Sequence, residues 1–151
     1  MKKITLSLIA LGLFNAAAAF AETPTPLPAA IAEHSGPIRI AVIRNLGSDD
    51  NTTQFVSGAI QEGKKLGFKI STFLSNGDDA KFQDFVNQAI SQKYDGIILS
   101  QGRDPYATAL VKKAVDAGIK VSVFDTAVNG QIPGVTVTQQ DDASLTELSF
   151  G

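Results

Sequence analysis

Residues 81–100, KFQDFVNQAISQKYDGIILS, decide the fold because a helix pattern leads directly into a strand pattern. In the first half, apolar residues recur three and four positions apart, which places them on one face of a helix: Phe82, Phe85, Val86, Ala89 and Ile90. The second half ends in the short apolar run Gly96–Ser100, which is typical of a parallel strand covered on both faces. The stretch predicts one helix–strand unit of an α/β fold.

The same unit recurs along the chain. We expect strands at residues 38–43 (IRIAVI), 68–74, 96–100, 119–124 and 135–138. A helix over residues 52–66 would bury a stripe made by Phe55, Val56, Ala59, Ile60 and Leu66, and Gly67 would end it. A third helix would start at Pro105, with Asp104 as its N-cap, and end at Gly118. Strands joined by single helices run parallel, so we predict a doubly wound, three-layer Rossmann-like sheet in the order 2-1-3-4-5.

Residues 1–21 have the pattern of a signal peptide. Lys2 and Lys3 precede the apolar run Ile4–Phe14, and Ala19 and Ala21 form the small-x-small cleavage pattern. The run is shorter than the ~20 residues that span a bilayer, so cleavage after Ala21 and a periplasmic location are favoured over an uncleaved anchor. Residues 22–37 contain four prolines and are expected to be a Pro-rich linker, in which the single histidine, His34, would be solvated.

Composition and motifs argue against several classes of function. Loss of the leader changes the net charge from −2 to about −4, and interspersed charges disfavour nucleic acid as a partner. The chain has no cysteine and one histidine, so neither a metal cluster nor a nucleophile–histidine pair is expected. Residues 58–64 fit G-x-x-x-x-G-K, but they lie inside an expected helix and Lys65 follows. We therefore predict no enzyme, no catalytic residues, no metal and no cofactor.

Polar loops follow the expected strands at their carboxyl ends, where ligands collect in open parallel sheets. Their amide, carboxylate and guanidinium groups suit the hydroxyl groups of a sugar. The candidate ligand-binding residues are Asn45, Asp50, Asn51, Gln101, Arg103 and Asp125. Asp50 or Asn51 could instead cap the helix that follows, and Arg103 could be a surface charge. Phe55 and Tyr106 could each offer a ring face, although Phe55 is expected to pack in the core.

Three segments together resemble a known family: AVIRNLGSDDNTTQFVSGAIQEGKKLGF, YDGIILSQGRDPYATALVKKAVDAGIKVSVFDTAV and GVTVTQQDDASL. They are similar to the periplasmic sugar-binding proteins of ABC importers, the type I periplasmic binding proteins, whose ligand core is shared with lactose-repressor-type regulators. The resemblance implies that residues 38–142 form the N-terminal lobe and that residues 143–151 begin a truncated second lobe. It also matches Asn45 and the Asp50/Asn51 region to the first ligand loop, and Asp125 to the acid that holds sugar hydroxyls. The family often has Pro near Gln101, and Arg or Asn where this chain has Thr126.

The expected function is the solute-binding component of an ABC importer, which would bind a small sugar or related polar solute and dock on the permease as a monomer. One lobe alone is expected to bind weakly or not at all. The sensor core of a lactose-repressor-type regulator is an alternative, but the leader occupies the place of its DNA-binding segment. A stand-alone exported flavodoxin-like module is a further alternative. A receiver module would need Asp and Lys where Ser100 and Gln139 stand.

Overall fold

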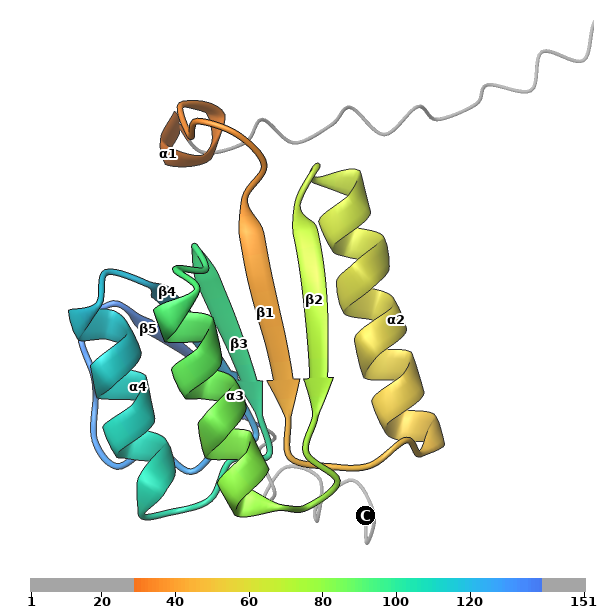
Figure 1. Ribbon diagram of the computed structural model, residues 1–151, viewed down its shortest axis with the longest axis vertical. Helices are drawn as coiled ribbons and strands as arrows, with labels where there is room; N and C mark the ends of the chain where they lie inside the picture. Colours follow the sequence, from red (N-terminus) through yellow and green to blue (C-terminus); the bar gives the residue numbers. More distant parts are fainter. Residues whose placement is uncertain (1–28, 140–151) are drawn as a thin grey trace, which may run out of the picture.

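The computed structural model describes residues 29–139, which form an α/β unit with a single sheet (Figure 1). The expected signal peptide, the first part of the linker and residues 140–151 lie outside the described residues. The elements in chain order are α1 (Ala29–Ala32), β1 (Arg39–Arg44), α2 (Asp50–Lys65), β2 (Lys69–Leu74), α3 (Asp79–Ser91), β3 (Gly96–Ser100), α4 (Tyr106–Asp116), β4 (Lys120–Phe124) and β5 (Val135–Thr138).

The five strands form one parallel sheet in the order β2-β1-β3-β4-β5, which confirms the predicted topology. The strands are in close register at their carboxyl ends. Arg44 of β1 pairs with Ser100 of β3, Ser100 pairs with Phe124 of β4, and Phe124 pairs with Thr138 of β5. The loops that follow these strands therefore leave the sheet from a common edge, which we call the carboxyl edge.

The core lies between the sheet and the pair α3 and α4, which lie together on one face (Figure 1). Alternate strand residues point to this face because side chains of a strand alternate between its two sides: Ala41, Ile43, Ile97, Leu99, Val121 and Val123. They meet Phe82 and Val86 of α3 and Val111 of α4, all fully buried. The helical periodicity of residues 82–90 is thus confirmed as a core-facing stripe.

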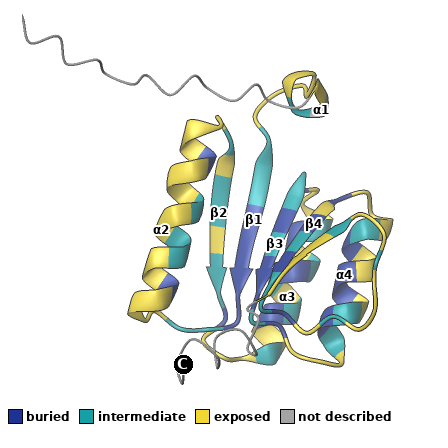
Figure 2. Cartoon of the chain, turned by 180° about the vertical axis from the view of Figure 1, so that it is seen from behind, coloured by how far each residue is buried: buried dark blue, intermediate teal, exposed yellow. Residues whose placement is uncertain are grey.

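Helix α2 covers the opposite face and completes the three layers, where it contacts β2 and β1. It lies very close to the sheet, because a methyl group on Gly63 would be 2.3 Å from Cγ1 of Ile70. The expected buried stripe is wrong at two positions, since Ile60 is 46% exposed and Leu66 36% exposed. Much of α2 is coloured as exposed in Figure 2. The physical reason is that α2 has the sheet on one side and no described helix beside it.

Local boundaries also differ from the sequence expectations. Strand β1 runs one residue further and includes Arg44. Asp104 does not cap α4, because the helix begins at Tyr106 and its N-cap position is Pro105, which makes no side-chain capping bond. The linker contains the single turn α1. His34 is exposed, as expected, and its Nε2 lies 3.0 Å from Oδ1 of Asp95, with which it forms an ion pair when the ring is protonated.

Candidate functional site

Three of the candidate residues are the first residues after neighbouring strands. Asn45 follows β1, Gln101 follows β3 and Asp125 follows β4. Each donates its backbone N–H to the last residue of the next strand: Asn45 to Ser100 O at 2.9 Å, Gln101 to Phe124 O at 3.3 Å, and Asp125 to Thr138 O at 3.1 Å. The parallel register therefore brings the three residues to adjacent positions along the carboxyl edge.

Two of these residues have a backbone conformation that residues other than glycine rarely adopt. Gln101 has φ +62° and Asp125 has φ +44°. Such conformations cost free energy and concentrate at functional sites, where the surrounding structure enforces them. The chain therefore turns sharply at the ends of β3 and β4. Both residues are half-buried, which keeps their polar groups at the carboxyl edge.

The loop after β1 is organised by Asp49, which is the N-cap of α2. Its carboxylate accepts the N–H of Thr52 at 2.6 Å. Bonds from the amide and the hydroxyl of Thr52 lower the pKa of Asp49 below its usual value, so the cap is ionised at neutral pH. The alternative in which Asp50 or Asn51 caps this helix is therefore wrong, and both are exposed residues of its first turn.

A buried arginine supports that first turn. Arg44 is 2% exposed, although the expected first strand ends one residue before it. Its guanidinium donates to Thr52 Oγ1 at 2.9 Å, to Ser100 Oγ at 2.7 Å and to Asn51 Oδ1 at 2.7 Å. Because Arg44 has only donors, it fixes the oxygen of Asn51 inward and leaves the NH₂ group at the carboxyl edge. Nothing in the apolar pattern of β1 signals this residue.

Aromatic rings complete the burial of Arg44. Its Cζ lies 4.8 Å from the ring centroid of Phe55, and Phe55 stacks on Phe124 at 5.5 Å. Phe55 is half-buried and packs against the guanidinium and the end of β4, rather than in the core as expected.

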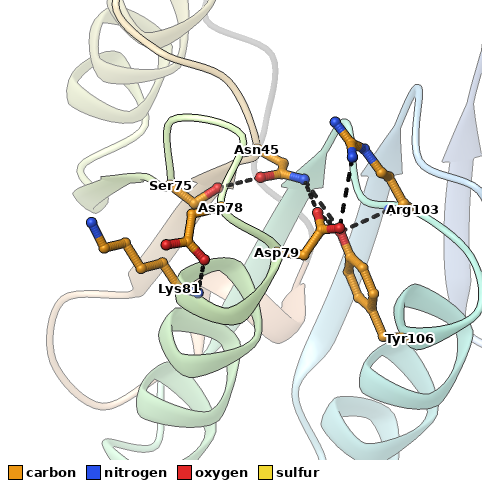
Figure 3. Close-up of polar contacts among 7 residues, drawn as sticks. All are labelled: Asn45, Ser75, Asp78, Asp79, Lys81, Arg103 and Tyr106. Carbon is orange, nitrogen blue, oxygen red and sulfur yellow. Dashed lines mark hydrogen bonds and ion pairs between the residues drawn. The ribbon is translucent and has the colours of Figure 1, made fainter.

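Asn45 is 1% exposed and its amide is bonded within the protein (Figure 3). Its Nδ2 donates to Oδ1 of Asp79 at 2.7 Å and to the hydroxyl of Tyr106 at 3.2 Å. Its Oδ1 accepts the hydroxyl of Ser75. Asn45 thus joins the ends of β1 and β2 to α3 and α4.

Asp79 and Tyr106, which accept from the amide of Asn45, are not among the ligand-binding residues predicted from the sequence. Tyr106 donates its hydroxyl to Oδ1 of Asp79 at 2.7 Å. Hydrogen bonds from Tyr106 and then Asn45 lower the pKa of Asp79, and burial followed by the bond to Asp79 raises the pKa of Tyr106. Asp79 does not cap α3, because Asp78 is its N-cap and accepts the N–H of Lys81 at 3.0 Å. The position of Asp79 just beyond the carboxyl end of β2 was the available signal.

Arg103 lies at the exposed side of the same cluster. Its side chain is 63% exposed, and Nη1 is 3.7 Å from Oδ2 of Asp79 (Figure 3). Its backbone N–H donates to the hydroxyl of Tyr106 at 3.1 Å. The guanidinium of Arg103 is therefore loosely paired, whereas its backbone N–H is held by Tyr106.

The loops after β3 and β4 are also joined to each other. Gly102 donates its N–H to Thr126 Oγ1 at 3.3 Å, and its oxygen accepts the N–H of Ala127 at 3.0 Å. A methyl group on Gly102 would be 2.9 Å from Cγ2 of Thr126. Thr126 is 1% exposed, so the residue that departs from the family pattern acts here as a buried brace.

The carboxyl edge offers carboxylates, amides and one guanidinium, which can accept from and donate to the hydroxyl groups of a polyol. Within residues 29–139, no group of three His, Cys, Asp or Glu could hold a metal. Helices in this described part are also too short or too polar to cross a membrane. Cavities of about 540 Å³ beside β5 and about 800 Å³ near His34 and Tyr94 do not include Asn45, Gln101 or Asp125 in their linings.

Comparisons with known proteins agree with this arrangement. Residues 40–148 match the family model described as "Periplasmic binding protein domain". A solved sugar ABC transporter protein from Yersinia enterocolitica is 78% identical, with a TM-score of 0.80 over 85% of this chain and 39% of that one. A 5-methylthioribose transporter solute-binding protein from Thermotoga lettingae is 28% identical, with a TM-score of 0.66 over 75% of this chain and 38% of that one.

A third solved structure shares the fold. It is a periplasmic solute-binding protein from Actinobacillus succinogenes with bound D-allose, 21% identical, with a TM-score of 0.58 over 63% of this chain and 34% of that one. No match was found among curated proteins. The chain thus spans less than two fifths of the length of each of these three structures.

Proposed function

The chain belongs to the periplasmic binding protein domain family, and from that membership we propose that it binds a small sugar or related polar solute for an ABC importer. Family membership implies a periplasmic location. Cleavage of the leader after Ala21, a monomeric state and docking on permease subunits are further parts of this proposal. The proposal involves neither a catalysed reaction nor a cofactor.

The observation that carries the proposal is the common position of Asn45, Gln101 and Asp125, each directly after a strand along one border of the sheet. Side chains placed in this way converge on a solute at the carboxyl edge. Two of the three residues turn the chain through left-handed backbone conformations, which the surrounding fold must enforce.

The residues have distinct roles in this proposal. Asp125 accepts hydrogen bonds from solute hydroxyls, as the resemblance to sugar-binding proteins implies. Gln101, Arg103 and the NH₂ group of Asn51 donate to solute oxygens, and Asp50 adds an acceptor at the first turn of α2. Asn45 positions the loops from beneath, because its amide is bonded within the protein. The mixture of donors and acceptors favours a neutral polyol over an anion or a cation.

A titration with D-allose, D-arabinose and 5-methylthioribose tests the proposal, with binding followed by NMR chemical shifts. We expect saturable shifts at residues 50–51, 101–103 and 125–126. The dissociation constant should be millimolar, because the described edge contacts only one side of a solute, whereas small-molecule sites bury most of the ligand. Saturable shifts confined to the amino end of the sheet, or no shifts with any of the three, would overturn the proposal. Micromolar binding would show that contacts beyond this edge contribute.

A matched pair of variants tests the assigned acceptor. Asp125→Asn removes a charged acceptor from the edge, and hydrogen bonds to charged groups contribute about 1.5–3 kcal/mol. Affinity should fall about tenfold or more. Asp116→Asn makes the same change on an exposed residue in the last turn of α4, away from the edge, and should leave affinity unchanged. Equal affinity of the two variants would remove Asp125 from the proposed site.

A further inference from the structure

The hydroxyl of Tyr106 joins four separate parts of the carboxyl edge. It accepts the backbone N–H of Arg103 at 3.1 Å and Nδ2 of Asn45 at 3.2 Å, and it donates to Asp79 at 2.7 Å (Figure 3). A phenol hydroxyl has one hydrogen and two lone pairs. All of its hydrogen-bonding capacity is therefore used to connect the end of β1, the start of α3, the loop after β3 and α4.

The hydroxyl and the carboxylate are not needed to close a helix or to fill the core. The N-cap of α3 is Asp78, and the ring of Tyr106 packs against Phe82 at 5.8 Å independently of its oxygen. The side chain of Asp79 is 39% exposed and that of Arg103 is 63% exposed. The hydroxyl and the carboxylate lie at the border of the sheet, where they hold the loop after β3 and also accept from the buried amide of Asn45.

That loop is held at two points. Gly102 is bonded to Thr126 of the neighbouring loop. The backbone of Arg103 is bonded to Tyr106, and its guanidinium is loosely paired with Asp79. Gln101 lies directly before these anchors and has a left-handed conformation. Release of the second anchor would leave Gln101 and Arg103 with more conformations to lose when a solute binds.

We propose that Tyr106 and Asp79 are positioning residues, which hold Gln101 and Arg103 in the geometry that meets the solute. This inference rests on the proposed function, because it assigns these residues a part in affinity. Ordering one free side chain at an interface costs about 0.5–1.5 kcal/mol. Removal of the Tyr106 hydroxyl should therefore weaken solute binding about three- to tenfold.

Amide hydrogen exchange of the ligand-free chain tests the anchor without any solute. In Tyr106→Phe the ring is kept, the Arg103 N–H loses its acceptor, and its exchange should become about tenfold faster or more. Exchange at Leu99 and Val123 in the core should not change. Tyr94→Phe is the matched control, because Tyr94 donates one bond to Ser71 at 3.0 Å on another part of the sheet, and it should leave Arg103 unaffected. Unchanged exchange at Arg103 in Tyr106→Phe would overturn the inference.

The predicted effect of Tyr106 on affinity is tested with D-allose, D-arabinose or 5-methylthioribose. The sugar used is whichever of the three binds the unaltered chain. Tyr106→Phe should weaken binding three- to tenfold and Tyr94→Phe should not. Asp79→Asn retains an oxygen that can accept from Tyr106 but loses the charge beside Arg103. The change in amide exchange at Arg103 should therefore be smaller than in Tyr106→Phe, and affinity for the solute should still fall measurably. Faster exchange without weaker binding would overturn positioning. Failure of the proposed function is seen separately, as the absence of binding by the unaltered chain.

Discussion

Two glycines of α2 should respond in opposite ways to the same substitution. A methyl group on Gly63 would lie 2.3 Å from Cγ1 and 2.5 Å from Cδ1 of Ile70, whereas one on Gly58 would have no atom within 4 Å. Alanine favours a helix interior by about 1 kcal/mol over glycine. Overpacking costs about 1–3 kcal/mol, and two carbon contacts this short place Gly63 toward the upper part of that range. We expect Gly58→Ala to stabilise the protein by about 0.5–1 kcal/mol and Gly63→Ala to destabilise it by about 1–2 kcal/mol.

Urea unfolding followed by circular dichroism measures both free energies, and a third variant identifies the cause. Ile70→Ala removes the two carbon atoms that the methyl group would strike. In that background Gly63→Ala should become stabilising, as at Gly58, and the double-mutant cycle should give a coupling energy of about 2 kcal/mol. If Gly63→Ala raises stability in the unaltered background, α2 does not lie as close to β2 as described. The position of its first turn, with Asp50 and Asn51, would then also be in doubt.

Two further predictions concern charged residues at the two ends of the sheet. Arg44→Lys should lower the free energy of unfolding by about 2–4 kcal/mol, because an ammonium cannot reproduce bonds to Thr52, Ser100 and Asn51 in a buried site. Arg39→Lys, at the start of β1, is the control and should change the free energy of unfolding by less than about 1 kcal/mol. Equal losses of stability in the two variants, measured by urea unfolding, would contradict this reasoning. The oxygens of Gly36 and Asp95 raise the pKa of His34 above its usual 6.5, so the stability that His34 contributes is complete below pH 6.5 and is lost as pH rises through the raised folded-state pKa. NMR titration of the ring should show this raised pKa and its return toward 6.5 in Asp95→Asn, and an unchanged pKa in that variant would exclude the ion pair as a cause.

The strand order was predictable because each of its determinants is local. The periodic stripe of residues 82–90 indicates a helix with one buried face, and short apolar runs such as Ile97–Leu99 indicate covered strands. Single helices between strands then leave few arrangements of the sheet. The prediction failed where burial depends on neighbours far along the chain. Ile60 and Leu66 fit a helical stripe, but their exposure depends on what lies beside α2, which periodicity in α2 does not encode.

The site was predictable in position but not in partners. Residues directly after parallel strands reach one edge whatever their identity, so Gln101 and Asp125 could be placed from strand boundaries alone. Arg44 escaped because a charged residue at the end of an apolar run suggests a loop. Its burial depends on three oxygen acceptors, from Asn51, Thr52 and Ser100, that become neighbours only after folding.

Asn45 shows why position alone does not assign a role. It follows β1 as Asp125 follows β4, yet Asn45 is 1% exposed while Asp125 is half-buried. The difference arises because side chains from the loop after β2, from α3 and from α4 enclose the amide of Asn45. A buried amide must have its donors and its acceptor satisfied, and Ser75, Asp79 and Tyr106 satisfy them here. A polar residue directly after a strand is therefore better placed to organise neighbouring loops where other side chains enclose it, as at Asn45, and better placed to meet a solute where it stays partly exposed, as at Gln101 and Asp125.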